Sequence, residues 1–302
     1  EVPGAKFMPQ MRNKHWDGYI RLLSVHTGEI YVGLLPKVID KLNLHNYTYE
    51  FRENKFYGLP FEVNEEISYE GVKDYMKSIC AHSPREYQVE GVYDALRHNR
   101  KLLISPTASG KSLMIYSIVR YYVDRGEKIL LVVPTTSLVE QMYKDFQDYG
   151  WDADSYCHQI YSGKEKTNEY PVTVTTWQSV YKLERSFFED YDVVIGDEAH
   201  LFKSKSLISI MTNLHHAKYR FGFTGTLDGT QTHKWVLEGL FGPSYKVTRT
   251  AELIEKGHIS KLDIRCLLLK HNPKKFETYE DEIQYLISHD KRNNFIKNLA
   301  ID

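Results

Sequence analysis

From residue 84 onward the sequence alternates short apolar runs with amphipathic stretches, and this rhythm limits the fold more than any other feature. Stretches with helical periodicity, such as residues 113–122 and 137–149, lie between most of the runs. Near-continuous apolar strands that alternate with helices indicate an α/β fold, in which helices cover both faces of a parallel sheet. The carboxyl ends of such strands lie at one edge, where ligands bind. The predicted strands are residues 102–104, 129–133, 172–175, 193–195 and 220–223.

The first 83 residues follow a different pattern, and the composition changes near residues 78–84. His26-Thr27-Gly28 reads as a turn between two short strands. Apolar residues at helical spacing follow, with Pro36 where the first turn of a helix tolerates it. This front part is predicted to be a small α+β domain. Its predicted elements are strands at residues 19–24, 30–32 and 47–51 and a helix at residues 35–44.

The overall charge and composition exclude several classes of protein. The 302 residues carry 39 Lys and Arg against 40 Asp and Glu, for a formal net charge of −1. Because domains that bind nucleic acid are often basic, this balance argues against tight static binding and leaves open a motor that moves along a strand. The apolar runs fall far short of the ~20 residues that span a bilayer, so no membrane contact is expected. Three scattered cysteines argue against a disulfide framework or a zinc site and favour the cytoplasm.

A candidate phosphate-binding loop follows the first predicted strand. It reads Ser105-Pro106-Thr107-Ala108-Ser109-Gly110-Lys111-Ser112 and leads into a helical stretch. The backbone N–H groups of such a loop and the positive end of the helix favour an anion. Gly110 allows close approach of the backbone, Lys111 can reach the β- and γ-phosphates, and the Ser112 hydroxyl can bind Mg²⁺. Ser105 stands where this motif usually has its first glycine, so an ordinary turn and helix cap is the alternative interpretation.

Two carboxylates end a later apolar run, in the order Asp197-Glu198-Ala199-His200. In a parallel sheet this end faces the same crevice as Lys111. Asp197 can hold Mg²⁺ through its water shell and Glu198 can orient and activate an attacking water, and hydrolysis of a phosphoanhydride needs both roles. A solvated acidic loop is the alternative. A reversed metalloprotease motif is excluded, because no second histidine follows at the spacing of one helical turn.

The next apolar run opens into a small hydroxyl-rich loop, Thr224-Gly225-Thr226. Residues 106–112, the tetrad at 197–200 and this loop resemble motifs I, II and III of the superfamily 2 helicases and translocases. Three further segments are similar to the adenine-reading motif and to motifs Ia and Ib of that family, in the correct order: Arg85-Glu86-Tyr87-Gln88, Pro134-Thr135-Thr136-Ser137-Leu138 and Thr175-Thr176-Trp177-Gln178-Ser179. The Trp16-Asp17-Gly18 turn of the front part further resembles the UvsW-type branched-DNA helicases of phages.

The resemblance implies an ATPase that uses ATP and Mg²⁺. The residues that would bind the nucleotide are Arg85, Gln88, Thr107, Ala108, Ser109, Gly110, Lys111 and Ser112. The catalytic residues would be Lys111, Asp197, Glu198 and His200. Ser112 and Asp197 would be the metal ligands.

Two of these roles are weighed against simpler ones. Gln88 would read the adenine edge, and the alternative is a surface amide on an amphipathic helix. His200 would couple the nucleotide site to Thr224 and Thr226, so that hydrolysis changes the grip on DNA. The alternative for His200 is a histidine that ends a strand and is satisfied by local hydrogen bonds.

Short hydroxyl and amide side chains suit contacts to phosphates that carry no sequence information. By resemblance, the residues of motifs Ia and Ib that would make these contacts are Thr135, Thr136, Thr175 and Gln178. The front domain could add a second grip, because basic residues beside an aromatic ring can hold phosphate and stack a base. A hairpin core tryptophan with a solvated charged rim is the alternative there. The residues concerned are Arg12, Lys14, Trp16 and Arg21.

Motors of this superfamily hydrolyse ATP between two RecA-like lobes, and the second lobe supplies a motif of the form Gln-x-x-Gly-Arg-x-x-Arg. No glutamine of this sequence begins that pattern. The expected plan is an accessory domain at residues 1–83, a first RecA-like ATP-binding lobe at 84–270, with a strand at 264–269, and a linker with the start of a truncated second lobe at 271–302. Such a fragment is expected to bind ATP weakly and hydrolyse little, because loss of an arginine finger commonly costs ~10³–10⁵ in rate.

The predicted function is that of an ATP-dependent DNA helicase or translocase acting on branched or duplex DNA, in recombination, repair or replication-fork processing. An RNA helicase, the motor subunit of a restriction system and a nucleotide-dependent binding module without translocation are the alternatives. DNA is the expected partner, with RNA second, and a monomer is the expected state. If the gene belongs to a phage, the expected location is the host cytoplasm.

Overall fold

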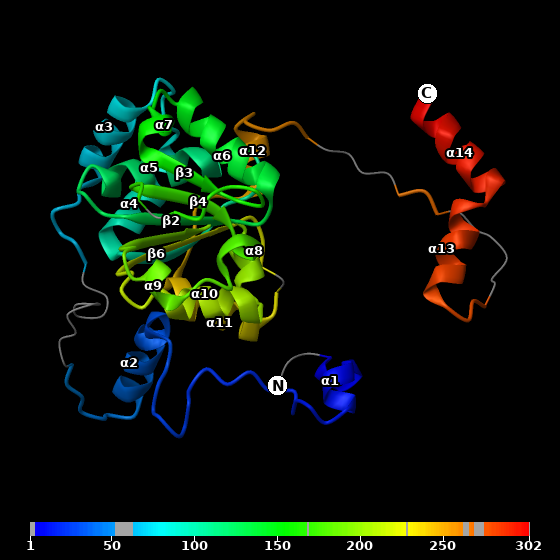
Figure 1. Ribbon diagram of the computed structural model, residues 1–302, viewed down its shortest axis with the longest axis horizontal. Helices are drawn as coiled ribbons and strands as arrows, with labels where there is room; N and C mark the ends of the chain where they lie inside the picture. Colours follow the sequence, from blue (N-terminus) through cyan, green and yellow to red (C-terminus); the bar gives the residue numbers. More distant parts are fainter. Residues whose placement is uncertain are drawn as a thin grey trace. The chain divides into compact units, whose positions relative to one another are not determined.

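The computed structural model describes residues 4–51, 63–167, 169–227, 229–261, 266–268 and 275–301 (Figure 1). Its contacts divide the chain into two units, residues 1–259 and 260–302. In the part of the chain that is described, no helix is long and apolar enough to cross a membrane.

The first unit is built on a sheet to which the described residues contribute seven strands, in the order β3-β4-β2-β5-β6-β1-β7. Each neighbouring pair is parallel. The predicted parallel α/β sheet is therefore confirmed, and β3 and β7 add two short strands that the apolar pattern did not reveal. The strands are β1 Arg100–Ile104, β2 Ile129–Val133, β3 Cys157–Ile160, β4 Val172–Thr176, β5 Val193–Gly196, β6 Tyr219–Thr224 and β7 Ser244–Lys246.

Helices pack on both faces of this sheet (Figure 1). β2 shows the arrangement most clearly, because Ile129, Leu131 and Val133 point into one core and Leu130 and Val132 into the other. The first core includes side chains of α4 Glu86–His98, α5 Lys111–Val123 and α6 Thr136–Asp148. The second includes side chains of η3 Ala199–Lys203, α10 Lys205–Asn213 and α11 Gln231–Phe241. Both faces of the strand are thus buried away from water, which explains its unbroken apolar sequence.

One further helix, α3 Tyr69–Ile79, joins the first core through Val72 and Met76. The remaining elements are short or lie outside these two layers. In the first unit they are η1 Ala5–Phe7, α1 Pro9–Arg12, η2 Val32–Leu34, α2 Leu35–Leu44, α7 Ala153–Tyr156, α8 Trp177–Val180, α9 Arg185–Phe188 and α12 Thr250–Glu255. The second unit contains α13 Tyr279–Ile287 and α14 Asp290–Ile301. The turn between these two helices is closed by Arg292 and Asn293, which donate to the carbonyls of Leu286 and Ile287 at 3.1 and 2.7 Å.

The strands predicted near the amino terminus are wrong, whereas the helix at residues 35–44 is confirmed. Of the described residues in this part, only Leu23 and Ile30 form a β-bridge, and residues 32–34 are a 3₁₀-helix. Residues 47–51 form no strand. An isolated two-stranded hairpin is marginal in water unless a third strand or a helix covers it, which accounts for the difference. Of the strand predicted at residues 264–269, only 266–268 are described, and they are not a strand; the rest lies outside the described residues.

The front segment is attached to the sheet-bearing part through η2, which lies directly on α11. A Cβ at Gly33 would lie 2.0 Å from the carbonyl oxygen of Glu238, so only glycine allows this approach. The Glu238 carboxylate, itself buried, is 3.2 Å from Lys37 of α2 and accepts a hydrogen bond of 2.8 Å from the Ser244 hydroxyl of β7. One buried acid thus connects the front segment, α11 and the edge of the sheet.

We expect Gly33→Ala to detach η2 and α2 from α11, because the backbone oxygen that opposes the new methyl group cannot rotate away. Overpacking of this kind costs about 1–3 kcal/mol. Limited proteolysis should cleave residues 35–51 faster in this variant than in the wild type.

Gly28→Asn is the control, because a Cβ there meets no atom within 4 Å and asparagine tolerates the left-handed backbone. Equal cleavage rates for Gly33→Ala and the wild type would contradict the docking.

Candidate functional site

Three loops meet at the carboxyl edge of β1, β6 and β5. The registers Ile104↔Thr224 and Gly196↔Gly222 align the ends of these strands, so the segments that follow them leave the sheet at one place. The Lys111 ammonium lies 2.9 Å from Oε1 of Glu198, across 87 residues of sequence. The loop that carries Lys111 and the acidic loop therefore lie together at one edge of the sheet, as predicted from the strand ends.

The loop between β1 and α5 is braced by its own serines. The Ser109 hydroxyl donates to the Pro106 carbonyl at 2.6 Å and lies 2.6 Å from the Ser105 hydroxyl, and both serine side chains are fully buried. Ala108 and Gly110 have positive φ angles of 64° and 77°. Ser105 thus replaces the usual first glycine without breaking the loop, since its hydroxyl becomes part of the brace.

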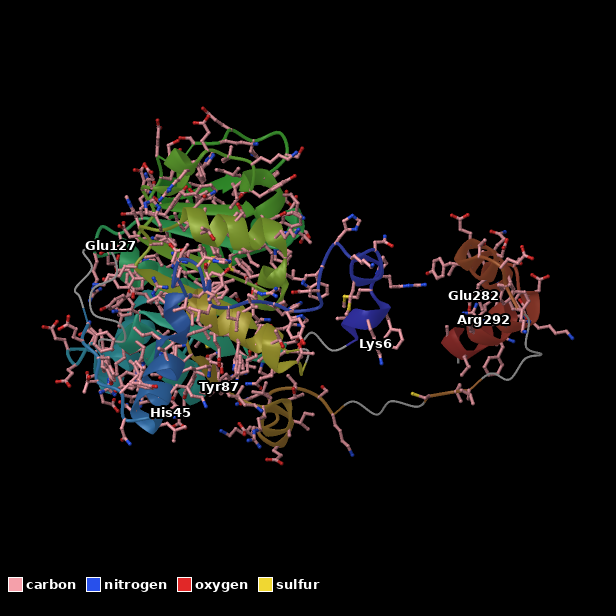
Figure 2. All side chains as sticks on the ribbon, turned by 90° about the horizontal axis from the view of Figure 1, so that it is seen from below. Lys6, His45, Tyr87, Glu127, Glu282 and Arg292 are labelled. Atoms are coloured by element: carbon pink, nitrogen blue, oxygen red, sulfur yellow. The ribbon has the colours of Figure 1, made fainter. Side chains whose placement is uncertain are left out.

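Gln88 lies beneath this loop and is buried. Its amide nitrogen donates to the Ser109 carbonyl at 2.9 Å, and its amide oxygen accepts from the backbone N–H of Arg85 at 2.8 Å. Tyr87, marked in Figure 2, donates to the same Ser109 carbonyl at 3.0 Å. A Cβ at Gly110 would lie 2.3 Å from the Gln88 amide nitrogen. Gln88 is therefore no surface amide: it positions the loop, while its reading of adenine stays a prediction.

Asp197 carries the strongest signal for a cation. Its side chain is buried, and among the described residues its Oδ1 has no hydrogen-bond partner. Burial raises the pKa of this carboxyl, against the opposing effect of the Lys111 charge and of the Glu198 N–H. A buried carboxylate oxygen without a partner costs free energy unless something else binds it. Hard cations such as Mg²⁺ prefer oxygen ligands of this kind.

The metal would need ligands from outside the chain. Within the described ranges, no group of three or more His, Cys, Asp or Glu side chains could hold a metal ion alone. Mg²⁺ in phosphate-transferring sites is commonly bound by one or two protein oxygens together with substrate phosphates and water. The single free oxygen of Asp197 fits that pattern.

Glu198, His200 and Thr224 form a continuous chain of polar contacts. His200 Nδ1 lies 3.3 Å from Oε2 of Glu198 and 3.1 Å from Oγ1 of Thr224. Because the Thr224 hydroxyl donates to the Thr226 carbonyl at 2.8 Å, its oxygen is left to accept from His200. Glu198 has a left-handed backbone, with φ 49°. Strain of this kind in a non-glycine residue is concentrated at functional sites.

Ser112 contacts a residue that the sequence motifs did not single out. Its hydroxyl lies 2.7 Å from the Tyr149 hydroxyl. Tyr149 caps α6 and is 37 residues away in sequence. No spacing rule connects it to the phosphate loop, so only the packing of α6 against α5 reveals it.

The residues predicted to contact nucleic acid divide into two groups. Thr135, Thr136 and Gln178 are exposed at the starts of α6 and α8, as such contacts require. The prediction for Thr175 is wrong. Its side chain is fully buried, and its hydroxyl donates to the Ile160 carbonyl at 2.8 Å, because the end of β4 is covered on both faces.

In the front segment, Arg12 and Lys14 are exposed. The indole of Trp16 is half-buried and donates to the Tyr19 carbonyl at 2.8 Å. Arg21 forms an ion pair with Asp17, so its charge is largely neutralised within the chain. These contacts favour the structural interpretation of the Trp16 turn, and Arg12 and Lys14 stay predictions as phosphate contacts.

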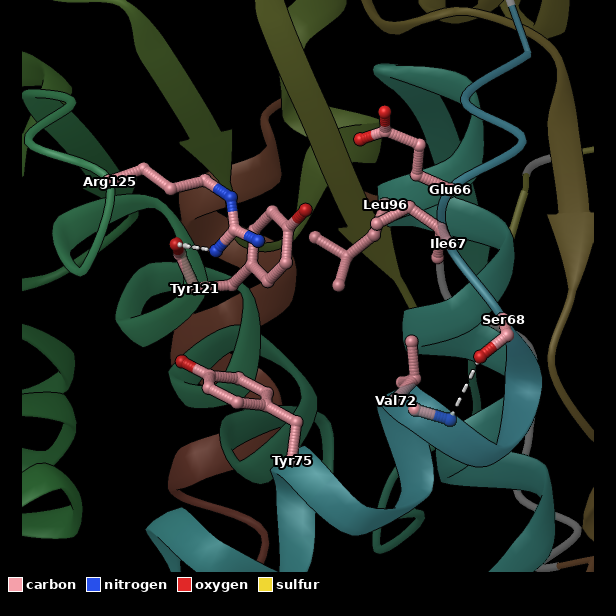
Figure 3. A pocket seen from close by; sticks show the side chains of 9 residues that line it. Glu66, Ile67, Ser68, Val72, Tyr75, Leu96, Tyr121 and Arg125 are labelled. Carbon is pink, nitrogen blue, oxygen red and sulfur yellow. Dashed lines mark hydrogen bonds between the residues drawn. The ribbon is translucent and has the colours of Figure 1, made fainter.

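A separate cavity of about 200 Å³, shown in Figure 3, shares no lining residue with this site. It is lined by Ser68, Tyr75, Leu96 and Arg125, with the Arg125 guanidinium over the Tyr121 ring. Its walls come from the first half of α3 and the carboxyl ends of α4 and α5, whereas the phosphate loop precedes the amino end of α5. It therefore takes no part in the chemistry described above.

Comparison with known proteins relates this chain to nucleic-acid motors. The family model described as the type III restriction enzyme, res subunit, matches residues 81–229. The ATP-dependent DNA helicase uvsW of Enterobacteria phage T4 is 33% identical over 322 residues, which cover all of this chain and 62% of that protein. The DNA 3'-5' translocase XPB2 of Sulfurisphaera tokodaii is 28% identical over 76% of this chain and 47% of that protein.

Comparison with solved structures supports the same relationship. The crystal structure of the UvsW helicase from bacteriophage T4 has a TM-score of 0.71 and 31% identity, over 82% of this chain and 89% of that one. A second T4 UvsW structure has the same TM-score and covers all of this chain, which spans 61% of its length. The RecA-like fold is thereby confirmed. The chain spans about three fifths of the length of the T4 relative.

We expect Asp197→Asn to stabilise the protein near neutral pH. Because burial raises the pKa of this carboxyl, the protonated form is favoured by folding, and that stabilisation is lost as the pH rises through the raised pKa. An amide carries no charge to bury. The melting temperature should rise by about 2–4 °C for each kcal/mol gained.

Thermal unfolding measured between about pH 4 and pH 8 tests this, and the difference should shrink in acid, where the wild type is neutral as well. Asp74→Asn, at an exposed position of α3, is the control. A melting temperature of Asp197→Asn below that of the wild type at neutral pH would contradict the expected cost of burial.

Proposed function

The chain belongs to the superfamily 2 helicases, among which it is of the UvsW type, and we propose that it supplies the ATP-binding lobe of a motor acting on branched or duplex DNA. The observation that carries this proposal is the line of contacts from Lys111 through Glu198 and His200 to Thr224. This line of contacts joins the loops that follow three strands at one edge of the sheet. It lies next to the Asp197 oxygen that has no hydrogen-bond partner among the described residues.

In the proposed mechanism, Lys111 leaves Glu198 when ATP arrives and binds the β- and γ-phosphates. Its departure releases the Glu198 carboxylate, which can then orient a water and accept its proton as the water attacks the γ-phosphorus. The bond from this phosphorus to the oxygen that it shares with the β-phosphate breaks, and ADP and inorganic phosphate are the products. Asp197 and Ser112 would hold Mg²⁺, whose chemistry is to neutralise charge on the phosphoryl oxygens. The ion pair thus keeps the two groups neutralised until substrate separates them.

His200 would report the state of Glu198 to the third loop. When Lys111 no longer pairs with Glu198, the carboxylate charge acts on His200 alone, 3.3 Å away. His200 in turn bonds Thr224, at the end of β6. Loss or gain of this contact shifts the loop that follows β6, which we propose as the route from hydrolysis to movement on DNA.

DNA is favoured as the track, because the relatives of 28% identity or more are named as a DNA helicase and a DNA translocase. Thr135, Thr136 and Gln178 would contact the sugar-phosphate backbone, and Arg12 and Lys14 would add charge from an accessory domain at residues 1–83. A lobe at residues 84–270 would bind ATP. A second lobe, beginning within residues 271–302, would complete the site in the whole protein.

We expect Lys111→Ala to abolish DNA-stimulated ATP hydrolysis in the full-length protein without unfolding it. Removal of one charged group that stabilises the transition state commonly costs about 10²–10³ in rate. Steady-state turnover, together with circular dichroism, measures both effects. Lys256→Ala, an exposed position at the end of α12, is the control, and ordinary turnover by Lys111→Ala would refute the site.

Glu198→Gln should separate binding from chemistry. The amide keeps the shape of the side chain but cannot take a proton, so hydrolysis should fall about 10²–10⁴-fold. The affinity for ATP should be at least that of the wild type, because Lys111 no longer has to leave a charged partner. Single-turnover hydrolysis and equilibrium binding of a fluorescent ATP analogue provide the two readouts. Glu255→Gln, exposed on α12, serves as the matched variant. Unchanged hydrolysis would remove Glu198 from its proposed role.

The preferred track is tested by stimulating the ATPase of the full-length protein with single-stranded DNA, duplex, fork, four-way junction and RNA. Forks and junctions should stimulate most. Stimulation by RNA alone would favour the RNA helicase, and indifference to all five would favour a binding module that does not translocate.

A further inference from the structure

The end of α6 reaches the residue after the phosphate-binding lysine. Ser112, in the first turn of α5, lies 2.7 Å from the hydroxyl of Tyr149, the residue that caps α6. The hydroxyl proposed to bind Mg²⁺ therefore already has a partner within the chain.

Either hydroxyl can donate in this contact, because each has one proton and can also accept. In both arrangements the tyrosine holds the Ser112 hydroxyl in one orientation, and a metal ion would bind to the same serine oxygen.

The tyrosine is held firmly in place. Its ring packs against Tyr116 of α5 at a centroid distance of 5.1 Å and against His82 at 6.3 Å, and the residue is half-buried. These contacts use the ring, and among the described residues the tyrosine hydroxyl hydrogen-bonds Ser112 alone. A phenylalanine at this position would keep the packing and lose only the hydroxyl.

We propose that Tyr149 is a positioning residue that holds Ser112 in a metal-free arrangement and so sets how strongly nucleotide binding depends on Mg²⁺. The proposal rests on the nucleotide site proposed above. Release of Ser112 from Tyr149 is part of the free-energy cost of loading the metal, and a variant without the tyrosine hydroxyl avoids that part.

The test is equilibrium titration of the full-length protein with a fluorescent ADP analogue, in Mg²⁺ and in EDTA. Tyr149→Phe should tighten binding in Mg²⁺ by about 2- to 10-fold, the factor that corresponds to the net strength of one hydrogen bond. Binding in EDTA should stay unchanged, because a general loosening of the fold would alter both conditions.

Matched controls lie on the same helix. Tyr143→Phe removes a hydroxyl that bonds Asp154 instead, and Asp148→Asn changes a carboxylate near the end of α6; neither should change the Mg²⁺ dependence. In the Ser112→Ala background, Tyr149→Phe should have no further effect.

Three results would overturn the inference: equal Mg²⁺ dependence of wild type and Tyr149→Phe, weaker Mg²⁺-dependent binding by the variant, or an effect that persists without Ser112. Failure of the proposed function itself is distinguishable, because the wild type would then bind no ADP analogue even with Mg²⁺ present.

Discussion

Parallel pairing of β5, β6 and β1 is the constraint on which the rest of the structure depends. It brings Lys111 and Glu198, 87 residues apart in sequence, to 2.9 Å from each other, and it sets Thr224 within 3.1 Å of His200. An antiparallel strand in this series would carry its loop to the opposite edge. The site is therefore a consequence of strand direction, and the side chains at the three strand ends decide what it does.

The site also shows opposing demands of stability and function. The Asp197 carboxylate is buried, and one of its oxygens has no hydrogen-bond partner among the described residues. Glu198 adopts a left-handed backbone conformation. Both features cost free energy in the protein without a ligand. The ion pair with Lys111 offsets part of this cost, and the serine brace of the phosphate loop keeps the backbone in place. The molecule is thus arranged to gain stability when an anion and a cation arrive together.

The sequence alone predicted the structure correctly where the local hydrophobic pattern matches the burial of the segment in the fold. The run at 129–133 forms a strand with those bounds, because both of its faces are buried and every residue is apolar. The sequence-based predictions were wrong where contacts with distant residues determine the structure. Residues 19–24 were predicted to be a strand but do not join a sheet, and the Thr175 hydroxyl donates to the Ile160 carbonyl. Tyr149 lies beyond prediction for the same reason, since its role depends on how one helix crosses another.

Hydrogen exchange of the backbone amides with and without Mg²⁺ and ADP tests the central claim most directly, because it reports on all three loops in one experiment. If the strand ends form one site, residues 105–112, 197–200 and 224–226 should gain protection together, at the same nucleotide concentration. Protection limited to residues 105–112 would contradict the account, since the acidic loop and the third loop would then lie outside the nucleotide site.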